Sequence, residues 1–127
     1  MNTKTPTVWL FCRVIDNFGD IGVSWRLAKQ LQQEQGLQVV LWVDDMRALQ
    51  ALVPAADVHA QHACCEGIRV LWWQEALVAD LMQEAPAADV VIETFACDVP
   101  DAVRLWMVDK PTLWLNLEYL TAETWVD

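Results

Sequence analysis

The sequence predicts a doubly wound α/β fold, in which helices cover both faces of a mostly parallel sheet. Three observations support this fold class. Apolar runs without charge, typical of strands covered on both faces, recur along the chain, beginning at Val8–Cys12. Segments with helical periodicity alternate with these runs. The turn between the first run and the first helix is short, polar and glycine-containing, as at the ligand-binding edge of such folds.

The first strand is therefore expected at Val8–Cys12, and an amphipathic helix follows it. Apolar side chains recur in this helix at steps of four, three and three residues, at Ile21, Trp25, Ala28 and Leu31. Gly36 ends the helix, and Leu37–Val43 is a second apolar run that predicts a second strand. A short helix is predicted at Met46–Val53, because Pro54 cannot continue it.

Residues 55–66 form the least regular part of the sequence. They include four residues that commonly bind zinc, His59, His62, Cys64 and Cys65. No second pair of ligands with the spacing of a structural zinc site occurs elsewhere in the sequence. We therefore interpret this region as a surface loop with incidental His and Cys residues, and we expect no metal site.

The alternation continues to the end of the sequence. The pattern predicts three more strands and two helices, the strands at Ile68–Trp72, Asp89–Phe95 and Thr112–Asn116, and the helices at Gln74–Glu84 and Pro100–Val108. The strand at Asp89–Phe95 leads into a polar segment, which we expect to face a site. No helix follows the fifth strand to close its layer, so we expect the sequence to be the first part of a longer chain.

Composition limits the classes of function. The 127 residues have room for one domain, and a hydrophobic content of 55% with eight tryptophans can fill its core. Eight basic residues against eighteen acidic ones give a net charge of −10. This charge disfavours binding to nucleic acid or an anionic membrane, and it attracts a basic partner within about a Debye length, roughly 8 Å. With no signal peptide or membrane-spanning segment in the sequence, and with Cys12 and Cys97 expected to be reduced, we expect a cytoplasmic protein.

The loop after the first strand carries two acids, Asp16 and Asp20. Asp20 stands at the predicted start of the helix, where a carboxylate can cap free N–H groups. Gly19 permits a positive φ, so that backbone could approach a ligand closely. Two carboxylates at this place suit general-base chemistry or the binding of a cation, and a guanidinium fits them best. The alternative is that Asp16 pairs with Arg13 and that Asp20 only caps the helix.

Several familiar sites are excluded. The dinucleotide-binding fingerprint G-x-G-x-x-G is absent, because N-F-G-D-I-G has glycines only at Gly19 and Gly22 and because Asp20 would repel a pyrophosphate. There is no nucleophile elbow and no phosphate-binding P-loop. A receiver domain is excluded because Trp72-Trp73 occupies the place of its phosphorylated aspartate and because Lys110-Pro111 precedes a strand instead of following one.

Two stretches resemble the EarP family, the protein-arginine rhamnosyltransferases that modify bacterial translation elongation factor P. They are D-N-F-G-D-I-G-V-S-W-R-L-A-K-Q-L, from Asp16 to Leu31, and N-L-E-Y-L-T-A-E, from Asn116 to Glu123. The resemblance implies a GT-B glycosyltransferase with two Rossmann-like halves that face a cleft. Residues 1–127 would be the N-terminal half, which receives the protein acceptor, and the C-terminal nucleotide-sugar domain would be absent from this chain.

The resemblance also implies the reaction. Rhamnose would pass with inversion from dTDP-β-L-rhamnose to one arginine of elongation factor P, without a metal or another cofactor, and would activate that factor for the rescue of stalled ribosomes. Matched to the family motif, Asp20 is the general base and Asp16 the second catalytic acid. The substrate-binding positions are Asn17, Phe18, Gly19, Glu118 and Tyr119. A catalytic glutamate of the C-terminal half has no counterpart here, so the isolated 127 residues are expected to be inactive.

The alternative function belongs to another class. A non-catalytic Rossmann-like module could use the same acidic loop to bind a basic segment of a protein. Binding of elongation factor P without transfer would favour that module, whereas a requirement for a sugar nucleotide would favour the enzyme.

Overall fold

The computed structural model describes residues 5–13, 19–54, 62–65, 67–74, 78–94, 99–108 and 112–117, with positions 19, 20, 62, 63, 65, 116 and 117 described by their backbone alone. Six strands and four helices alternate along these ranges. The strands are β1 (Thr7–Cys12), β2 (Gln38–Val43), β3 (His62–Cys65), β4 (Ile68–Trp72), β5 (Val90–Thr94) and β6 (Leu113–Leu117). The helices are α1 (Gly19–Gln33), α2 (Met46–Leu52), α3 (Val78–Glu84) and α4 (Asp101–Val108).

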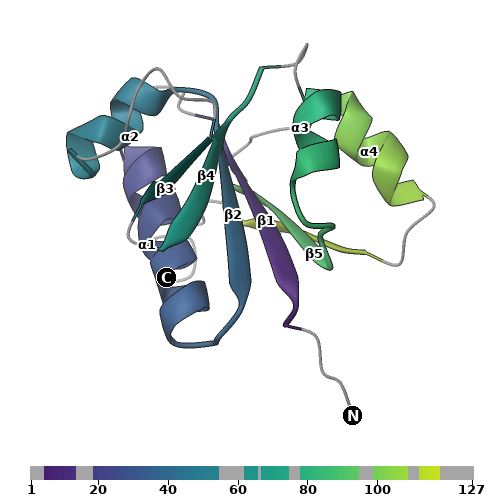
Figure 1. Ribbon diagram of the computed structural model, residues 1–127, viewed down its shortest axis with the longest axis horizontal. Helices are drawn as coiled ribbons and strands as arrows, with labels where there is room; N and C mark the ends of the chain where they lie inside the picture. Colours follow the sequence, from purple (N-terminus) through teal and green to yellow (C-terminus); the bar gives the residue numbers. More distant parts are fainter. Residues whose placement is uncertain are drawn as a thin grey trace, which may run out of the picture.

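The strands form one sheet in the order β3-β4-β2-β1-β5-β6. Strands β4, β2, β1, β5 and β6 run parallel to one another, and β3 runs antiparallel to β4 at one edge. Helices α1 and α2 lie on one face of the sheet, and α3 and α4 lie on the other (Figure 1). The predicted α/β fold with five parallel strands is therefore confirmed, and it is Rossmann-like.

The central strand β1 sends alternate side chains to two different cores. Val8, Leu10 and Cys12 join the core beneath α1 and α2, whereas Trp9 and Phe11 join the core beneath α3 and α4. All six residues of β1 are buried. A strand that is covered on both faces must be apolar on both, which explains the unbroken apolar run in the sequence.

The core beneath α3 and α4 is built around stacked rings, which we call the aromatic layer and which consist of Trp9, Phe11, Trp42, Trp73 and Trp106. Neighbouring ring centroids lie 4.9 Å (Phe11–Trp42), 5.1 Å (Trp9–Trp42) and 5.1 Å (Trp9–Trp106) apart. The indole N–H of Trp9 donates to the carbonyl oxygen of Pro86 at 2.9 Å. These contacts fix the face of the sheet on which α3 and α4 lie.

Two predictions about the elements were wrong. The region of His62–Cys65 was interpreted as a loop, yet it forms strand β3, which pairs with β4 through a turn at Gly67 with φ of +85°. A strand on the outside of a sheet needs no apolar run, so H-A-C-C gave no strand pattern. Gln74 was expected to start a helix, but it lies outside α3, which begins at Val78.

Other features concern the surface. Cys12 is buried and Cys64 is exposed, and neither forms a disulfide, while Cys97 lies outside the described residues. Strand β6 exposes Leu113, Trp114 and Leu115 at the open edge of the sheet. Across the described ranges, no helix has the length and apolar character that a membrane span requires.

Candidate active site

The candidate site lies where the strand order of the sheet reverses. From β1 the chain first builds outward to β2 and β4, and it later returns to the other side of β1 with β5 and β6. In open α/β sheets, ligands bind outside the carboxyl ends of the strands at such a switch point. The residues that follow β1 and β5 therefore surround the place where a substrate would bind.

Helix α1 is fixed to this edge by a chain of buried hydrogen bonds. Ser24 donates from its hydroxyl to the hydroxyl oxygen of Thr94 at 3.3 Å, and Thr94 donates to the carbonyl oxygen of Phe11 at 2.8 Å. Ser24 and Thr94 are both essentially inaccessible to solvent. These bonds join α1 to β5 and β1, because each strand contributes one partner.

Asp20 occupies a backbone position close to these bonds. It lies in the first turn of α1, one helical turn before Ser24, and residues four apart lie on the same side of a helix. The helix runs back along the sheet from its carboxyl edge, so its first turn lies at the carboxyl ends of β1 and β5. The predicted general base therefore belongs to the switch point.

The structure corrects one expectation for this loop. Asp20 was placed at the start of the helix, where it could cap free N–H groups, but α1 begins at Gly19, so Asp20 is inside the first turn. A carboxylate there still interacts favourably with the helix dipole. Gly19, which permits a positive φ, belongs to α1, and the glycines with positive φ among the described residues are Gly36 and Gly67.

The other predicted site residues lie outside the described residues. These are Asp16, Asn17, Phe18, Glu118 and Tyr119. The structure thus brings together the backbones of Gly19 and Asp20 at the switch point and leaves the other five positions as predictions.

Glu93 is a buried acid at the same edge, on the face of the sheet opposite α1. Its carboxylate is 6% exposed and accepts hydrogen bonds from the backbone N–H of Val99 and the indole N–H of Trp114, both at 3.0 Å. It thereby ties the end of β5 to the start of the α4 segment and to β6. From the sequence, the end of this strand was predicted only to lead into a polar segment that faces a site. An acid inside an apolar strand also indicates a carboxylate with dedicated partners.

Arg13 follows β1 and lies against an aromatic ring. Its guanidinium carbon is 5.3 Å from the ring centroid of Trp73, a cation–π distance. Its Nε is buried and has no hydrogen-bond partner within the ranges that the structure describes. The alternative pairing of Arg13 with Asp16 stays a prediction, because Asp16 lies outside those ranges.

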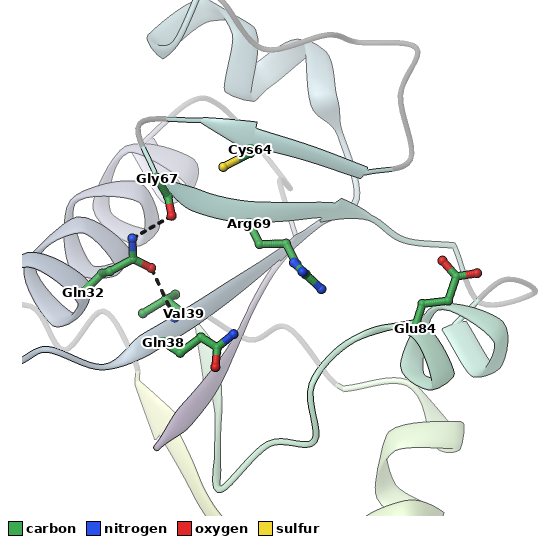
Figure 2. A pocket seen from close by; sticks show the side chains of 7 residues that line it. All are labelled: Gln32, Gln38, Val39, Cys64, Gly67, Arg69 and Glu84. Carbon is green, nitrogen blue, oxygen red and sulfur yellow. Dashed lines mark hydrogen bonds between the residues drawn. The ribbon is translucent and has the colours of Figure 1, made fainter. Parts of the chain in front are cut away.

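A hollow of about 570 Å³ lies at the opposite, amino edge of the sheet. Figure 2 shows the Gln32 amide bridging two elements there: it donates to the carbonyl oxygen of Gly67 at 2.7 Å and accepts from the N–H of Val39 at 3.4 Å. Gln38 accepts from the hydroxyl of Thr7 at 3.1 Å. These amides hold the strand starts together. The amides of Gln32 and Gln38 in this hollow have structural roles, and the hollow lies at the edge of the sheet opposite the predicted site.

No group of three or more His, Cys, Asp and Glu residues that could hold a metal ion occurs among the residues for which the structure gives positions.

The family model described as elongation factor P (EF-P) rhamnosyltransferase EarP matches residues 8–127. The chain belongs to the EarP family. The match includes the whole of both motifs that suggested the resemblance, from Asp16 to Leu31 and from Asn116 to Glu123.

Curated relatives from three organisms agree with this assignment, and each is named protein-arginine rhamnosyltransferase. The relative from Neisseria meningitidis is 53% identical over 124 residues, which are 97% of this chain and 31% of the relative. The relative from Pseudomonas aeruginosa is 49% identical over 92% of this chain and 30% of its own length. The relative from Shewanella oneidensis is 41% identical over 93% of this chain and 31% of its own length. This EarP chain thus spans about a third of the length of these relatives.

Proposed function

We propose that this protein acts as an inverting glycosyltransferase that moves rhamnose from dTDP-β-L-rhamnose to an arginine of translation elongation factor P. The names of the relatives support rhamnosyl transfer to arginine, and the family description supports elongation factor P as the acceptor. The observation that carries the proposal is the position of Asp20, the base in the family motif, at the start of α1 beside the switch point of the sheet.

In this proposal the described sheet is the N-terminal, acceptor-binding half of a GT-B enzyme that works in the cytoplasm. Because the chain covers only about a third of its relatives, we assign most contacts with the nucleotide to residues outside it. The acidic surface supports this division, since a net charge of −10 suits an acceptor segment that presents an arginine.

The mechanism needs one proton acceptor. The nitrogen lone pairs of arginine are delocalised and its guanidinium stays protonated at neutral pH, so it attacks a sugar only when it is oriented and a base takes a proton. As the bond between nitrogen and the anomeric carbon forms, the bond from that carbon to dTDP breaks and the electron pair leaves with the nucleotide. Asp20 accepts the proton from the attacking nitrogen, and Asp16 holds the guanidinium in place. These steps require no metal.

The described hydrogen bonds support Asp20 in this role. A base must keep its position relative to the acceptor within a fraction of an ångström, and rigid elements hold such positions better than loops do. Helix α1 is held to β1 and β5 by the bonds of Ser24 and Thr94, one turn below Asp20. The helix dipole also favours a negative charge in the first turn.

The intact mass of elongation factor P tests the proposal. The complete enzyme, mixed with dTDP-rhamnose and this factor, should add one deoxyhexose. Asp20→Asn should lower the rate about 10²–10⁴-fold, the usual contribution of a general base. Asp80→Asn is a matched control, because Asp80 also lies in the first turn of a helix, α3, and is exposed. Wild-type turnover in the Asp20 variant would rule out its role as the base.

The binding module remains the second candidate, and the net charge of −10 is the observation that favours it. It requires association of elongation factor P with the complete protein, unaffected by dTDP-rhamnose, and no change in mass. Transfer of a deoxyhexose by the wild-type protein would eliminate it.

A further inference from the structure

Arg13 and Trp73 present two unused hydrogen-bond donors at the carboxyl edge of the sheet. The Nε of Arg13 and the Nε1 of Trp73 are both buried, and neither has an acceptor among the residues that the structure describes. Trp73 is 2% exposed and Arg13 is half-buried. A buried donor without an acceptor is unfavourable. The indole Nε1 of Trp42, in the same aromatic layer, is also buried without an acceptor, but Trp42 is fully covered, whereas Arg13 is half-buried and within reach of a ligand. The free donor of Arg13 therefore indicates that an acceptor is supplied by something that binds there.

We propose that Arg13, supported by Trp73, binds an oxyanion group of one of the two substrates. This inference rests on the proposed function, and it adds a substrate-binding residue to the acidic loop. Arg13 is a binding residue in this proposal because its guanidinium contacts the substrate, whereas Trp73 is a positioning residue that holds the plane of the guanidinium.

The chemistry of the pair favours an oxyanion over other ligands. A guanidinium has five donors and no acceptor, and its planar fork matches the two oxygens of a carboxylate or phosphate. The guanidinium carbon lies 5.3 Å from the ring centroid of Trp73, and the buried Nε keeps a donor that no described residue uses. A second guanidinium would be repelled, so the acceptor arginine itself is excluded as the ligand.

The surroundings make Arg13 unusual in this protein. It is one of only eight basic residues against eighteen acidic ones, and it follows the central strand directly, at the switch point. The side chains of β1 alternate between the two faces, so Arg13 continues the row of Trp9 and Phe11 toward the aromatic layer. A cation held at this edge can attract a negatively charged part of a substrate that the acidic surface would repel elsewhere.

Two sources of the oxyanion share this chemistry. One is the diphosphate of the nucleotide sugar, which gains negative charge as the sugar leaves. The other is a carboxylate near the modified arginine of the acceptor protein. Steady-state kinetics separate them, because each substrate has its own KM.

The experiment uses the complete enzyme with Arg13→Met and, as a matched control, Arg69→Met. Arg69 is exposed on β4 and lines the hollow at the opposite edge of the sheet (Figure 2), so its loss changes the net charge equally. Arg13→Met should raise one KM about tenfold or more, the effect of losing one charge-assisted hydrogen bond. A higher KM for dTDP-rhamnose assigns the phosphate, and a higher KM for elongation factor P assigns the carboxylate. Arg69→Met should leave both unchanged.

Three further variants separate binding from folding. Arg13→Lys keeps the charge but loses the planar fork, and we expect it to recover only part of the affinity. Trp73→Phe keeps a stacking ring and should raise the same KM less than Trp73→Leu does. Unchanged KM values for both substrates in Arg13→Met, with or without a lower kcat, would overturn the proposal. If the wild-type enzyme transfers no sugar, the proposed function fails first, and this inference fails with it.

Discussion

The two faces of the sheet hold the candidate site by different means. Beneath α1 and α2 the core is mainly aliphatic, and α1 is joined to the strands by the hydrogen bonds of Ser24 and Thr94. Beneath α3 and α4 the rings of the aromatic layer contact one another, and Trp73, which meets Phe11 edge-on, lies under Arg13. One face therefore positions the site through directional hydrogen bonds and the other through packing of aromatic rings. Substitutions on the two faces should accordingly have different effects on stability.

The largest expected loss of stability comes from substitutions at two adjacent residues of β2, which point to the two different cores. Trp42 and Leu41 are both fully buried, but Trp42 contacts Trp9 and Phe11 in the aromatic layer whereas Leu41 packs in the aliphatic core. Replacing either by Ala should lower the free energy of unfolding, by about 3–5 kcal/mol for Trp42 and by about 2–5 kcal/mol for Leu41. We expect the larger loss for Trp42, because its larger ring and its contacts with two other rings are removed. Urea unfolding measures both. Equal costs would mean that ring stacking adds nothing to burial.

Removing the hydrogen bonds of Ser24 and Thr94 should cost less stability than removing Trp42, and the costs of the two substitutions should depend on each other. Thr94→Val removes the hydroxyl that serves both Ser24 and Phe11, and it should cost about 1–3 kcal/mol of unfolding free energy because buried groups lose their partners. Ser24→Ala should cost less, since Thr94 keeps its bond to Phe11. A double-mutant cycle should show that the two costs do not add. Additive costs would show that the bonds act independently and do not form one chain.

The smallest expected effect is a gain in stability. Gly22 lies inside α1, and a Cβ there would meet, among the residues that the structure describes, only Leu52 Cδ1 of α2, at an ordinary contact distance of 3.9 Å. Gly22→Ala should therefore raise the free energy of unfolding by about 0.5–1 kcal/mol. Gly36, just beyond α1, has φ of +70°, so Gly36→Ala should lower stability instead, by about 1 kcal/mol. Thermal unfolding of both variants gives the two signs, and a loss for Gly22→Ala would mean that the α1–α2 contact is tighter than the structure indicates.

Most of the fold could be predicted from the sequence, because parallel strands buried on both faces are continuous apolar runs. Ile68–Trp72 was predicted with the bounds of β4, and the other four parallel strands were predicted within about two residues. Strand β3 was missed because an edge strand is stabilised by pairing with β4, and pairing leaves no pattern in its own sequence. The start of α3 was predicted too early, since Gln74 lies outside the helix.

The candidate site could be predicted in part. The motif after β1 pointed to Asp20, and the fold placed its backbone at the switch point. The stacking of Arg13 on Trp73 could not be predicted, because the two residues are far apart in the sequence and meet only when β4 joins the sheet. The hydrogen bond from Trp114 to Glu93 could not be predicted either, because Trp114 lies in β6 and meets Glu93 only when β6 pairs with β5.

The central position of β1 also determines the order in which the protein can fold. Thr7 pairs with Gln38, 31 positions later, whereas Val8 pairs with Val90 across 82 positions. Contacts between residues so far apart in the sequence form slowly. During synthesis they cannot form until β5 has emerged from the ribosome. A nascent chain can therefore close β1 against α1 and β2 while the other edge of β1 waits without a partner. The switch point, and with it the candidate site, therefore forms only after β5 has been synthesised.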